Sequence, residues 1–258
     1  MKAPKNIRLG LVFMLLGCIA LIVAALCFLV SRVPGCRCNV RIIPGIAVPG
    51  SQYASEEALC DDAYFREIPD FLTGAQCDAL IAAASQRPMK PSTIGITTGS
   101  HVSNNIRDSE NTWFFPGEHD IADLVRAKTR ALLRSIPGST MPEAYGMEAL
   151  QVARYGQGGK YTNHFDADEC GAPGFMECSA TQRLCTMLIY LNEPDEGGET
   201  HFPLLGHSVK PRKGKALFFW VSDPVTRKVF QKTLHAGLPV TRGTKWIANQ
   251  WVLASSPS

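Results

Sequence analysis

A change of pattern after Pro142 most constrains the fold of this chain. From there on, short runs rich in β-branched and aromatic residues alternate with turn residues, and four such runs cover residues 150–155, 184–191, 216–221 and 246–252. Runs of this length and composition predict short strands of an antiparallel β structure. The second half of the domain is therefore expected to be mainly β.

Two helical segments precede these strands. Thr73 can cap a helix that begins near Gly74, because Gln76 stands where a capping box needs it. A second helix is expected over about residues 119–135, with its apolar side formed by Ile121, Leu124, Val125 and Leu132. Helices followed by many strands indicate an α+β, mainly β fold, and we expect a double-stranded β-helix (jelly roll) with the helices packed on one side.

The amino terminus has the composition of a membrane segment. Residues 9–30 contain no charged side chain, and as a helix they would span roughly 33 Å, enough to cross a bilayer. We expect a short basic tail over 1–8, a single transmembrane signal-anchor over 9–30, a stem rich in proline and glycine over 31–61, and a catalytic domain over 62–258. A cleaved signal peptide is the main alternative for the apolar segment.

The cysteines favour an oxidising compartment, and the net charge of +3 gives no reason to expect a nucleic-acid partner. Cys170 and Cys178 flank a short loop and are the expected disulfide pair, whereas Cys77 and Cys185 are interpreted as buried apolar residues. The remaining cysteines lie in or near the apolar segment and the stem: Cys18, Cys27, Cys36, Cys38 and Cys60.

Three residues have the right chemistry for a metal centre. His164 and Asp166 are two positions apart, and in a strand such residues point to the same face. His235 can supply a third ligand from a distant strand. Two histidines and one carboxylate form the facial triad of non-haem iron(II) oxygenases, which leaves coordination positions open for other ligands. A zinc hydrolase that uses the same three residues and a bound water is an alternative.

A lysine follows this set at a suggestive spacing. Lys245 lies ten residues after His235, beyond a Thr-Arg-Gly turn, so we expect it on the next strand of a hairpin that returns beside the metal. Trp246 and Ile247 indicate that this strand is buried, and a buried lysine needs an anionic partner. The distal carboxylate of 2-oxoglutarate would be such a partner.

Taken in order, several segments resemble the prolyl 4-hydroxylase family of iron/2-oxoglutarate oxygenases, over about residues 68–253. The matching segments are residues 71–81, 106–109, 148–155, 159–166, 186–192, 197–203, 210–220 and 235–251. Two regions depart from the family pattern: residues 106–109 read Ile-Arg-Asp-Ser instead of Arg-Thr-Ser, and the loop over 167–181 keeps little of it. Both departures concern the substrate rather than the iron chemistry.

The resemblance implies a role for each matching residue. It makes His164, Asp166 and His235 the iron ligands and Lys245 the 2-oxoglutarate-binding lysine. It also places further residues in or near the site: Tyr155 and Thr186 as hydrogen-bond partners of the co-substrate, Trp251 as a lining aromatic, and Arg107 and Arg183 near the peptide groove. The alternative for the two arginines is a solvated loop position. His201 and His207 are interpreted as loop residues outside the metal set, and Phe165, Leu188 and Trp220 as an apolar surround of the metal.

The activity implied by the resemblance is hydroxylation of peptidyl proline, of the procollagen type, in proline-rich polypeptides. It would be coupled to oxidative decarboxylation of 2-oxoglutarate to succinate and carbon dioxide, with Fe(II), O2 and L-ascorbate. With the anchor, this predicts a lumenal catalytic domain on the endoplasmic reticulum or Golgi membrane. The alternatives are hydroxylation of another residue or of a small molecule, and a non-catalytic jelly-roll binding module.

Overall fold

The structure of the chain is a computed structural model that describes residues 65–93, 105–135, 145–169, 181–224 and 226–254. The expected membrane segment, the stem, and the loop that contains Cys170 and Cys178 lie outside these residues. Within the described ranges, no helix combines the length and the hydropathy that crossing a bilayer requires.

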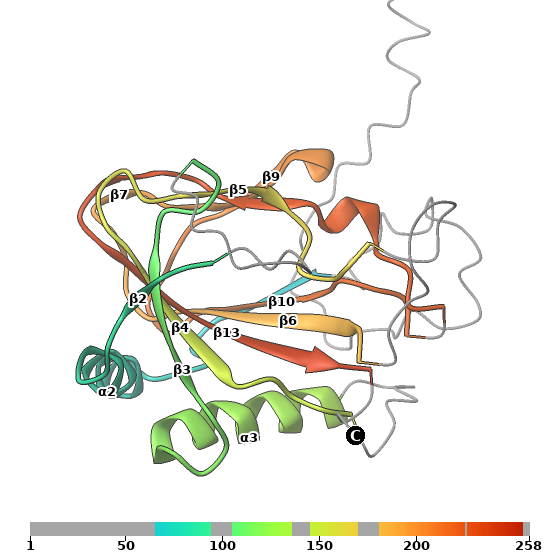
Figure 1. Cartoon of the computed structure of the whole chain (residues 1–258), viewed down its shortest axis with the longest axis horizontal. Helices are drawn as coiled ribbons and strands as arrows, with labels where there is room; N and C mark the ends of the chain where they lie inside the picture. Colours follow the sequence, from blue (N-terminus) through green and yellow to red (C-terminus); the bar gives the residue numbers. More distant parts are fainter. Residues whose placement is uncertain (1–64, 94–104, 136–144, 170–180, 225, 255–258) are drawn as a thin grey trace, which may run out of the picture. The chain divides into compact units, whose positions relative to one another are not determined.

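A seven-stranded antiparallel sheet forms the centre of the described domain (Figure 1). Its strands, in spatial order, are β1 (Phe65–Ile68), β10 (Ala216–Trp220), β6 (Arg183–Tyr190), β13 (Lys245–Leu253), β4 (Leu150–Tyr155), β3 (Glu110–Phe114) and β2 (Lys90–Pro91). The four strands predicted from composition are β4, β6, β10 and β13, and each is confirmed to within one residue at either end.

Shorter strands form two smaller sheets. One has the order β5 (Tyr161–His164), β11 (His235–Gly237), β8 (Thr200–Phe202) and β9 (His207–Val209), and the other pairs β12 (Val240–Arg242) with β7 (Glu196–Gly197). Two 3-10 turns, Pro203–Leu205 and Gln231–Thr233, connect parts of this layer. In Figure 1 these strands lie on the opposite side of the large sheet from the helices. The mainly β architecture is consistent with the expected jelly roll.

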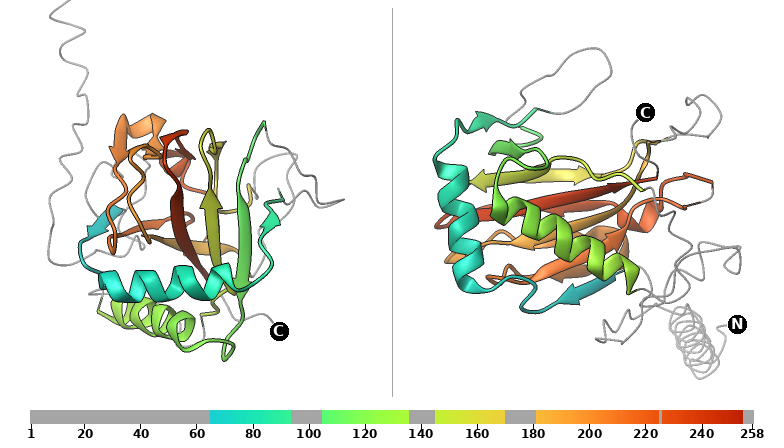
Figure 2. Two further views of the ribbon diagram at one scale, coloured as in Figure 1. Left: turned by 90° about the vertical axis from the view of Figure 1, so that its left-hand side faces the viewer. Right: turned by 90° about the horizontal axis from the view of Figure 1, so that it is seen from below.

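Both predicted helices are confirmed. In α2 (Gly74–Ser85) the Thr73 hydroxyl accepts from the Gln76 backbone, and the Gln76 side chain accepts from the Thr73 backbone, which completes the expected capping box. Helix α3 (Asp120–Arg134) is capped by His119, whose Nδ1 accepts from the Ile121 N–H at 3.3 Å. Figure 2 shows both helices against the same face of the large sheet.

Alternation along the strands divides the interior into two clusters. On β6, Cys185, Met187 and Ile189 belong to the cluster that includes the helices. The intervening Leu188 and Tyr190 belong to a second cluster, which faces the small sheets. Period-two alternation therefore gives the large sheet two buried faces, and the second one carries the polar residues of the site described below.

The structure corrects three expectations for single residues. Trp220 packs in the helix-side cluster, not around the metal, because it shares the parity of Phe218 on β10. His201 and His207 are not loop residues: they lie on β8 and β9, outside the set of possible metal ligands. The prediction for the two described cysteines is confirmed, since Cys77 and Cys185 are buried and free.

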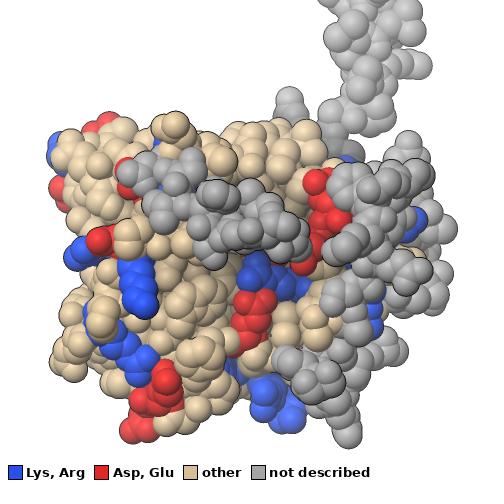
Figure 3. Space-filling model, viewed as in Figure 1, with Lys and Arg blue, Asp and Glu red and all other residues tan. Residues whose placement is uncertain are grey.

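Charged side chains of both signs share the surface. On the face drawn in Figure 3, the lysines and arginines of the described residues are interspersed with aspartates and glutamates. The described part of that face therefore presents no extended area of one sign.

Candidate metal centre

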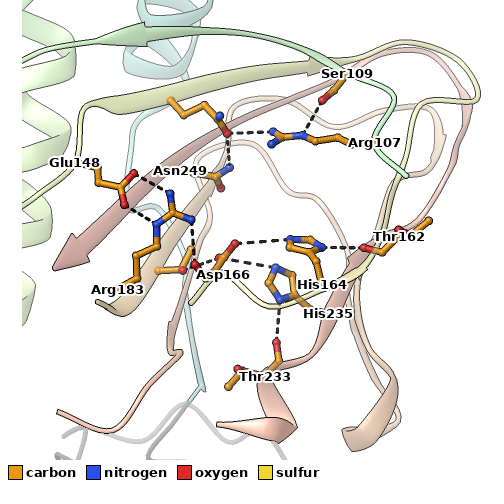
Figure 4. A network of polar contacts seen from close by, with 12 residues as sticks. Arg107, Ser109, Glu148, Thr162, His164, Asp166, Arg183, Thr233, His235 and Asn249 are labelled. Carbon is orange, nitrogen blue, oxygen red and sulfur yellow. Dashed lines mark hydrogen bonds and ion pairs between the residues drawn. The ribbon is translucent and has the colours of Figure 1, made fainter. Parts of the chain in front are cut away.

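Three predicted ligands come together on the inner side of the small sheet. His164 ends β5 and His235 begins β11, and the two residues are direct partners in the antiparallel ladder. The ligand atoms of His164, Asp166 and His235 all lie within 4.8 Å of one another. Asp166 Oδ1 is 3.7 Å from His164 Nε2, and its Oδ2 is 3.9 Å from His235 Nε2 (Figure 4). One divalent ion could contact all three groups.

Asp166 does not reach this position by alternating with His164 along a strand, as the sequence predicted. Strand β5 ends at His164, and Asp166 lies in the bend that follows. Its carboxylate accepts a hydrogen bond of 2.6 Å from the Thr186 hydroxyl on β6, and its carbonyl accepts one of 3.0 Å from Arg183 Nη1. The large sheet therefore holds the carboxylate in place, while the small sheet supplies both imidazoles.

Backbone carbonyls orient the two imidazoles. His164 Nδ1 lies 2.8 Å from the Thr162 carbonyl, and His235 Nδ1 lies 2.9 Å from the Thr233 carbonyl. A carbonyl can only accept, so Nδ1 carries the hydrogen and Nε2 presents its lone pair to the site. Both Nε2 atoms face Asp166 (Figure 4).

The protonation states suit a metal. Burial and the neighbouring His235 lower the pKa of His164 far below its ordinary value, so its ring is neutral near pH 7. Burial opposes ionisation of Asp166, but the two histidines outweigh it and keep the pKa of the carboxyl below its usual range. A neutral imidazole at His164 and an ionised carboxylate at Asp166 are what a divalent cation needs from these two residues.

Aromatic rings enclose the histidines. Tyr161 stacks on His164 with ring centroids 3.5 Å apart. Phe202 and Phe219 lie 5.4 and 5.1 Å from the His235 ring. The sequence analysis assigned this role to Trp220 and missed its neighbour Phe219. Because β10 is apolar on both faces, its composition does not reveal which side chains point to the metal site.

Lys245 also reaches the site, although not on a paired hairpin strand. β12 pairs with β7, whereas β13 belongs to the large sheet and sets Lys245 opposite Tyr155 on β4. The expected hairpin is therefore wrong: the chain passes from one sheet to another after the turn at Gly243, whose φ of 87° favours glycine. The side chain of Lys245 is only 3% exposed.

Two tyrosine rings lie near the Lys245 ammonium, and a glycine lies against its side chain. Its Nζ lies 5.5 Å from the Tyr155 ring centroid and 5.8 Å from that of Tyr190. A Cβ added at Gly198 would stand 3.2 Å from Lys245 Cδ, so the bare glycine lets the lysine lie against the backbone. Burial lowers the pKa of Lys245 to about 8, partly offset by Glu199. Among the described residues no carboxylate forms a salt bridge with this ammonium, which leaves it available to an anionic ligand.

These groups line a single pocket. The three candidate ligands and Lys245 share its wall with other residues: Arg107, Tyr155, Tyr161, Leu188, Thr200, Gly237, Ile247, Asn249 and Trp251. A pocket with a metal triad and a buried cation can hold a ligand that chelates the metal and carries a second anionic group.

Of the other residues predicted to contact the co-substrate, two line the pocket and one supports a metal ligand instead. Tyr155 and Trp251 line the pocket, as expected. Thr186 gives its hydroxyl hydrogen to Asp166, so in this structure it supports a ligand carboxylate. Leu188 belongs to the pocket wall, and Phe165 lines a second, adjoining pocket.

Both arginines lie at that second pocket, Arg107 buried and Arg183 half-buried. Arg183 pairs with both oxygens of Glu148 at 2.5 and 2.8 Å and stacks over Trp251 at 3.9 Å. Arg107 lies 4.8 Å above the Tyr161 ring and donates to Gln151 Oε1 at 3.1 Å. Both arginines and Trp251 line the second pocket, together with Trp113, Gln151, Tyr161, His164, Asp166 and others.

Several polar residues at the site were missed from sequence. Gln151 accepts from both Arg107 and Asn249, and this buried group links β4 to β13 (Figure 4). Thr200 lines the pocket beside Lys245. The available signal was a polar residue on an otherwise apolar strand, as at Gln151 within residues 150–155 and Asn249 within 246–252.

Comparison with known proteins gives consistent matches. Residues 150–253 match the model of the 2OG-Fe(II) oxygenase superfamily. The chain is 33% identical over 202 residues to "Probable prolyl 4-hydroxylase 9" of Arabidopsis thaliana, which covers 71% of this chain and 66% of the relative. It is 31% identical over 202 residues to prolyl 4-hydroxylase 13 of the same plant, covering 72% of this chain and 69% of the relative. The chain thus spans about two thirds of the length of these relatives.

Among solved structures, the chain is similar to the viral collagen prolyl hydroxylase vCPH from Paramecium Bursaria Chlorella virus-1 in its complex with 2OG. The sequence identity is 44% and the TM-score 0.63, with 74% of this chain and 96% of the viral chain covered. The superfamily match covers β4 to β13, which include all three candidate ligands and Lys245. This chain belongs to the prolyl 4-hydroxylase family of 2OG-Fe(II) oxygenases.

Proposed function

We propose that this protein hydroxylates proline residues in proline-rich polypeptides, with Fe(II) held by His164, Asp166 and His235 and 2-oxoglutarate anchored by Lys245. The observation that carries the proposal is the placement of the metal triad in one pocket with a buried lysine that forms no salt bridge to any described carboxylate. The triad alone would suit several reactions. A dicarboxylate co-substrate needs both features at once, because one of its ends must chelate the metal and the other must meet a cation.

The donor set fits iron. Two imidazoles and one carboxylate on one side of the site leave the other side free for further ligands. When bound, Fe(II) with 2-oxoglutarate and O2 would supply the oxidising chemistry that hydroxylates a carbon and releases succinate and carbon dioxide. We propose L-ascorbate as the reductant that keeps the iron in the ferrous state.

The residues of the chain bind and orient. The carbonyls of Thr162 and Thr233 fix the ring orientation of the two histidines, and Thr186 fixes the Asp166 carboxylate. Lys245 would pair with the distal carboxylate of the co-substrate, and Tyr155 would donate to the same group from the opposing strand. Phe202 and Phe219 cover one side of His235 and keep water from it.

The second pocket supports a peptide substrate. It adjoins the triad through His164 and Asp166, and it is also lined by Trp113 and Trp251, whose ring centroids are 5.9 Å apart. Aromatic walls suit the ring of proline and the extended shape of proline-rich chains. Arg107, which is buried, and Arg183, which is half-buried, offer guanidinium groups that can donate to peptide carbonyls.

The alternatives are less well supported by this site. A zinc hydrolase needs a free general base beside the metal-bound water, and Glu148, one of the acidic residues that line the second pocket, is not free because Arg183 holds it. It also leaves Lys245 without a role. A binding module gives no reason for three ligand atoms to share one small space. Hydroxylation of another residue would use the same iron site and is separated by the substrate panel below.

We also propose the membrane topology and the domain bounds given by the sequence: a signal-anchor over 9–30, a stem over 31–61, and a catalytic domain over 62–258 in the lumen of the endoplasmic reticulum or Golgi. The uncharged run supports the anchor. Protease protection of the full chain in microsomes tests this directly. A fragment that survives protease until detergent is added supports the lumenal domain; digestion without detergent contradicts it.

The activity is tested on the purified chain with Fe(II), 2-oxoglutarate, ascorbate and a panel of peptides. The panel contains collagen-like and other proline-rich sequences, a lysine-containing analogue, and free proline. Succinate release and addition of one oxygen atom to a prolyl residue should rise together, and both should vanish in His164→Ala. Oxygen on lysine or on free proline, with the proline peptides unmodified, would contradict the substrate assignment; no succinate from folded, iron-loaded protein would contradict the enzyme class.

A further inference from the structure

An exposed carboxylate lies at the edge of the second pocket. Asp168 is exposed and lines this pocket, two residues after the metal ligand Asp166. Among the described residues, no lysine, arginine or histidine forms an ion pair with Asp168. Arg183 is close enough for its charge to interact with Asp168, but it already binds both oxygens of Glu148. Within the described part of the chain, the Asp168 carboxylate therefore has no cation of its own.

Gln182 fixes the backbone that carries this carboxylate. Strand β5 ends at His164, so the residues that follow have no partner in the ladder. The Gln182 side chain takes the place of such a partner: its Oε1 accepts from the Asp168 N–H at 3.0 Å, and its Nε2 donates to the Asp168 carbonyl at 2.6 Å. Gln182 itself is only 2% exposed. Asp168 is thus an exposed residue whose two backbone polar groups are both held from the interior.

The same pocket contains buried donors that suit a peptide. Trp251 is buried and lines the pocket, and its Nε1–H donates to no described residue. A buried donor without a partner costs free energy, so this group favours a ligand that brings an acceptor. Arg107 donates from Nε to Ser109 and from Nη2 to Gln151, which leaves it other N–H groups. The buried donors suit peptide carbonyls, whereas the exposed carboxylate at the edge suits a positively charged side chain.

The position of Asp168 limits which substrate side chains can reach it. Two residues of chain span at most about 7 Å, so the Cα atoms of Asp168 and Asp166 lie within that distance. An extended proline-rich chain rises about 3.1 Å per residue. When the target proline lies at the metal, a lysine or arginine within about three positions of it can therefore reach the carboxylate with its long side chain.

We propose that Asp168 is a specificity-determining residue, which makes the enzyme prefer proline-rich peptides with a lysine or arginine within about three positions of the proline to be hydroxylated. This inference rests on the proposed function, because it takes peptidyl proline as the substrate. The metal ligands and Lys245 take no part in it, so Asp168 affects the choice of peptide and not the oxidation itself.

The test compares kcat/KM for proline-rich peptides that differ at one flanking position at a time. Each position carries lysine, uncharged norleucine or glutamate. An exposed ion pair changes affinity by a small factor, so at one or more positions lysine should exceed norleucine by about 2- to 5-fold, and glutamate should be poorer than norleucine. The difference should lie in the KM for the peptide. It should disappear in 1 M salt, where charges are screened beyond about 3 Å.

Two variants of Asp168 and a matched control assign the preference to this residue. Asp168→Asn keeps the shape of the side chain and should abolish the preference for lysine. Asp168→Lys reverses the charge and should make the glutamate peptide the best substrate. Glu169→Lys is the control, because Glu169 is the neighbouring exposed carboxylate but does not line the pocket. It makes the same change in net charge and should keep the preference for lysine.

The outcomes are distinct. Equal kcat/KM for the lysine, norleucine and glutamate peptides at every position would overturn the inference. A preference for lysine that persists in Asp168→Asn, or that is lost to the same extent in Glu169→Lys, would also overturn it. If Asp168→Lys does not fold, Asp168→Asn against Glu169→Lys decides. A wild-type chain that hydroxylates none of the peptides would instead contradict the proposed function, and the inference with it.

Discussion

The two faces of the large sheet are built from the same strands but serve different ends. On β6, the residues that point to the helices are Cys185, Met187 and Ile189, all apolar and fully buried. The residues that alternate with them are Thr186, Leu188 and Tyr190: Thr186 orients Asp166, Leu188 lines the pocket, and Tyr190 donates to Thr200. One face packs against the helices, and the other carries the polar groups of the site. A substitution at a residue that points to the helices should therefore act mainly on stability. A substitution at a residue that points to the small sheets should also act on binding.

Removal of a metal ligand should have the largest effect on activity. His164→Ala leaves two ligands and should reduce succinate release by more than about 100-fold, since even residues that only support ligands are worth that much. Metal analysis of the purified variant should show lost iron with an unchanged circular dichroism spectrum. His201→Ala is the matched control, because His201 lies on a neighbouring strand outside the triad. Equal activity in the two variants would remove His164 from the metal site.

Replacement of the buried lysine should separate stability from binding. In Lys245→Met the distal carboxylate loses its cation, and 2-oxoglutarate binding should weaken by about 100-fold or more. The unliganded protein should become more stable by up to about 3 kcal/mol, because burial lowers the pKa of Lys245 from 10.5 to about 8. Denaturant titration without ligand measures the second effect. A loss of stability would show that the lysine already has a partner in the unliganded protein.

The pH dependence of binding follows from the same group. Above pH 8 the free protein loses the Lys245 proton, so the affinity for 2-oxoglutarate should fall about tenfold per pH unit. The unfolded chain keeps that proton up to about pH 10.5, so between these values the unfolded state binds more protons and this group's contribution to stability rises with pH. Calorimetric titrations at several pH values check the first statement. In Lys245→Met both dependences should disappear.

Loss of the hydroxyl that supports Asp166 should have a smaller effect. Thr186→Val removes the 2.6 Å hydrogen bond to the carboxylate and keeps the side-chain volume. We expect iron to bind about 10-fold more weakly, as is usual when a group behind a metal ligand is removed. A competition titration with a chelator measures this change. Unchanged iron affinity would mean that the Arg183 hydrogen bond to the Asp166 carbonyl is enough to place this ligand.

A matched pair of isoleucines gives the smallest and sharpest comparison. Ile189→Val on the helix side and Ile247→Val at the pocket each remove one buried methylene and should each cost about 1 kcal/mol of unfolding free energy. Only Ile247→Val should also change the dissociation constant of 2-oxoglutarate. Equal binding effects in both variants would show that the two faces are not independent.

The sequence predicted the long elements because local physics dominates there. The capping box at Thr73 and Gln76 and the β-branched runs of β4, β6, β10 and β13 each specify their own structure. It could not predict strands of two or three residues such as β7 and β12, since these are too short to show a period and form only by pairing with each other.

The site was predicted in its residues but not in its geometry. His164, Asp166, His235 and Lys245 converge as expected, yet Asp166 lies beyond its strand and Lys245 comes from the facing sheet. Both depend on long-range contacts, through Thr186 and through the pairing of β13 with β4, that no local pattern contains. Trp220 was misplaced because an apolar strand does not reveal which of its faces points to the metal.

The central claim is that the polar face of the large sheet, with the triad and Lys245, couples 2-oxoglutarate to hydroxylation of peptidyl proline. The most direct measurement is turnover of a proline-rich peptide under isotopically heavy O2, followed by mass spectrometry of both products. The account predicts one heavy oxygen in the prolyl residue and one in succinate, in equal amounts, with neither formed by His164→Ala. Heavy oxygen in succinate but in no residue of any peptide, or peptide oxygen derived from water, would contradict it.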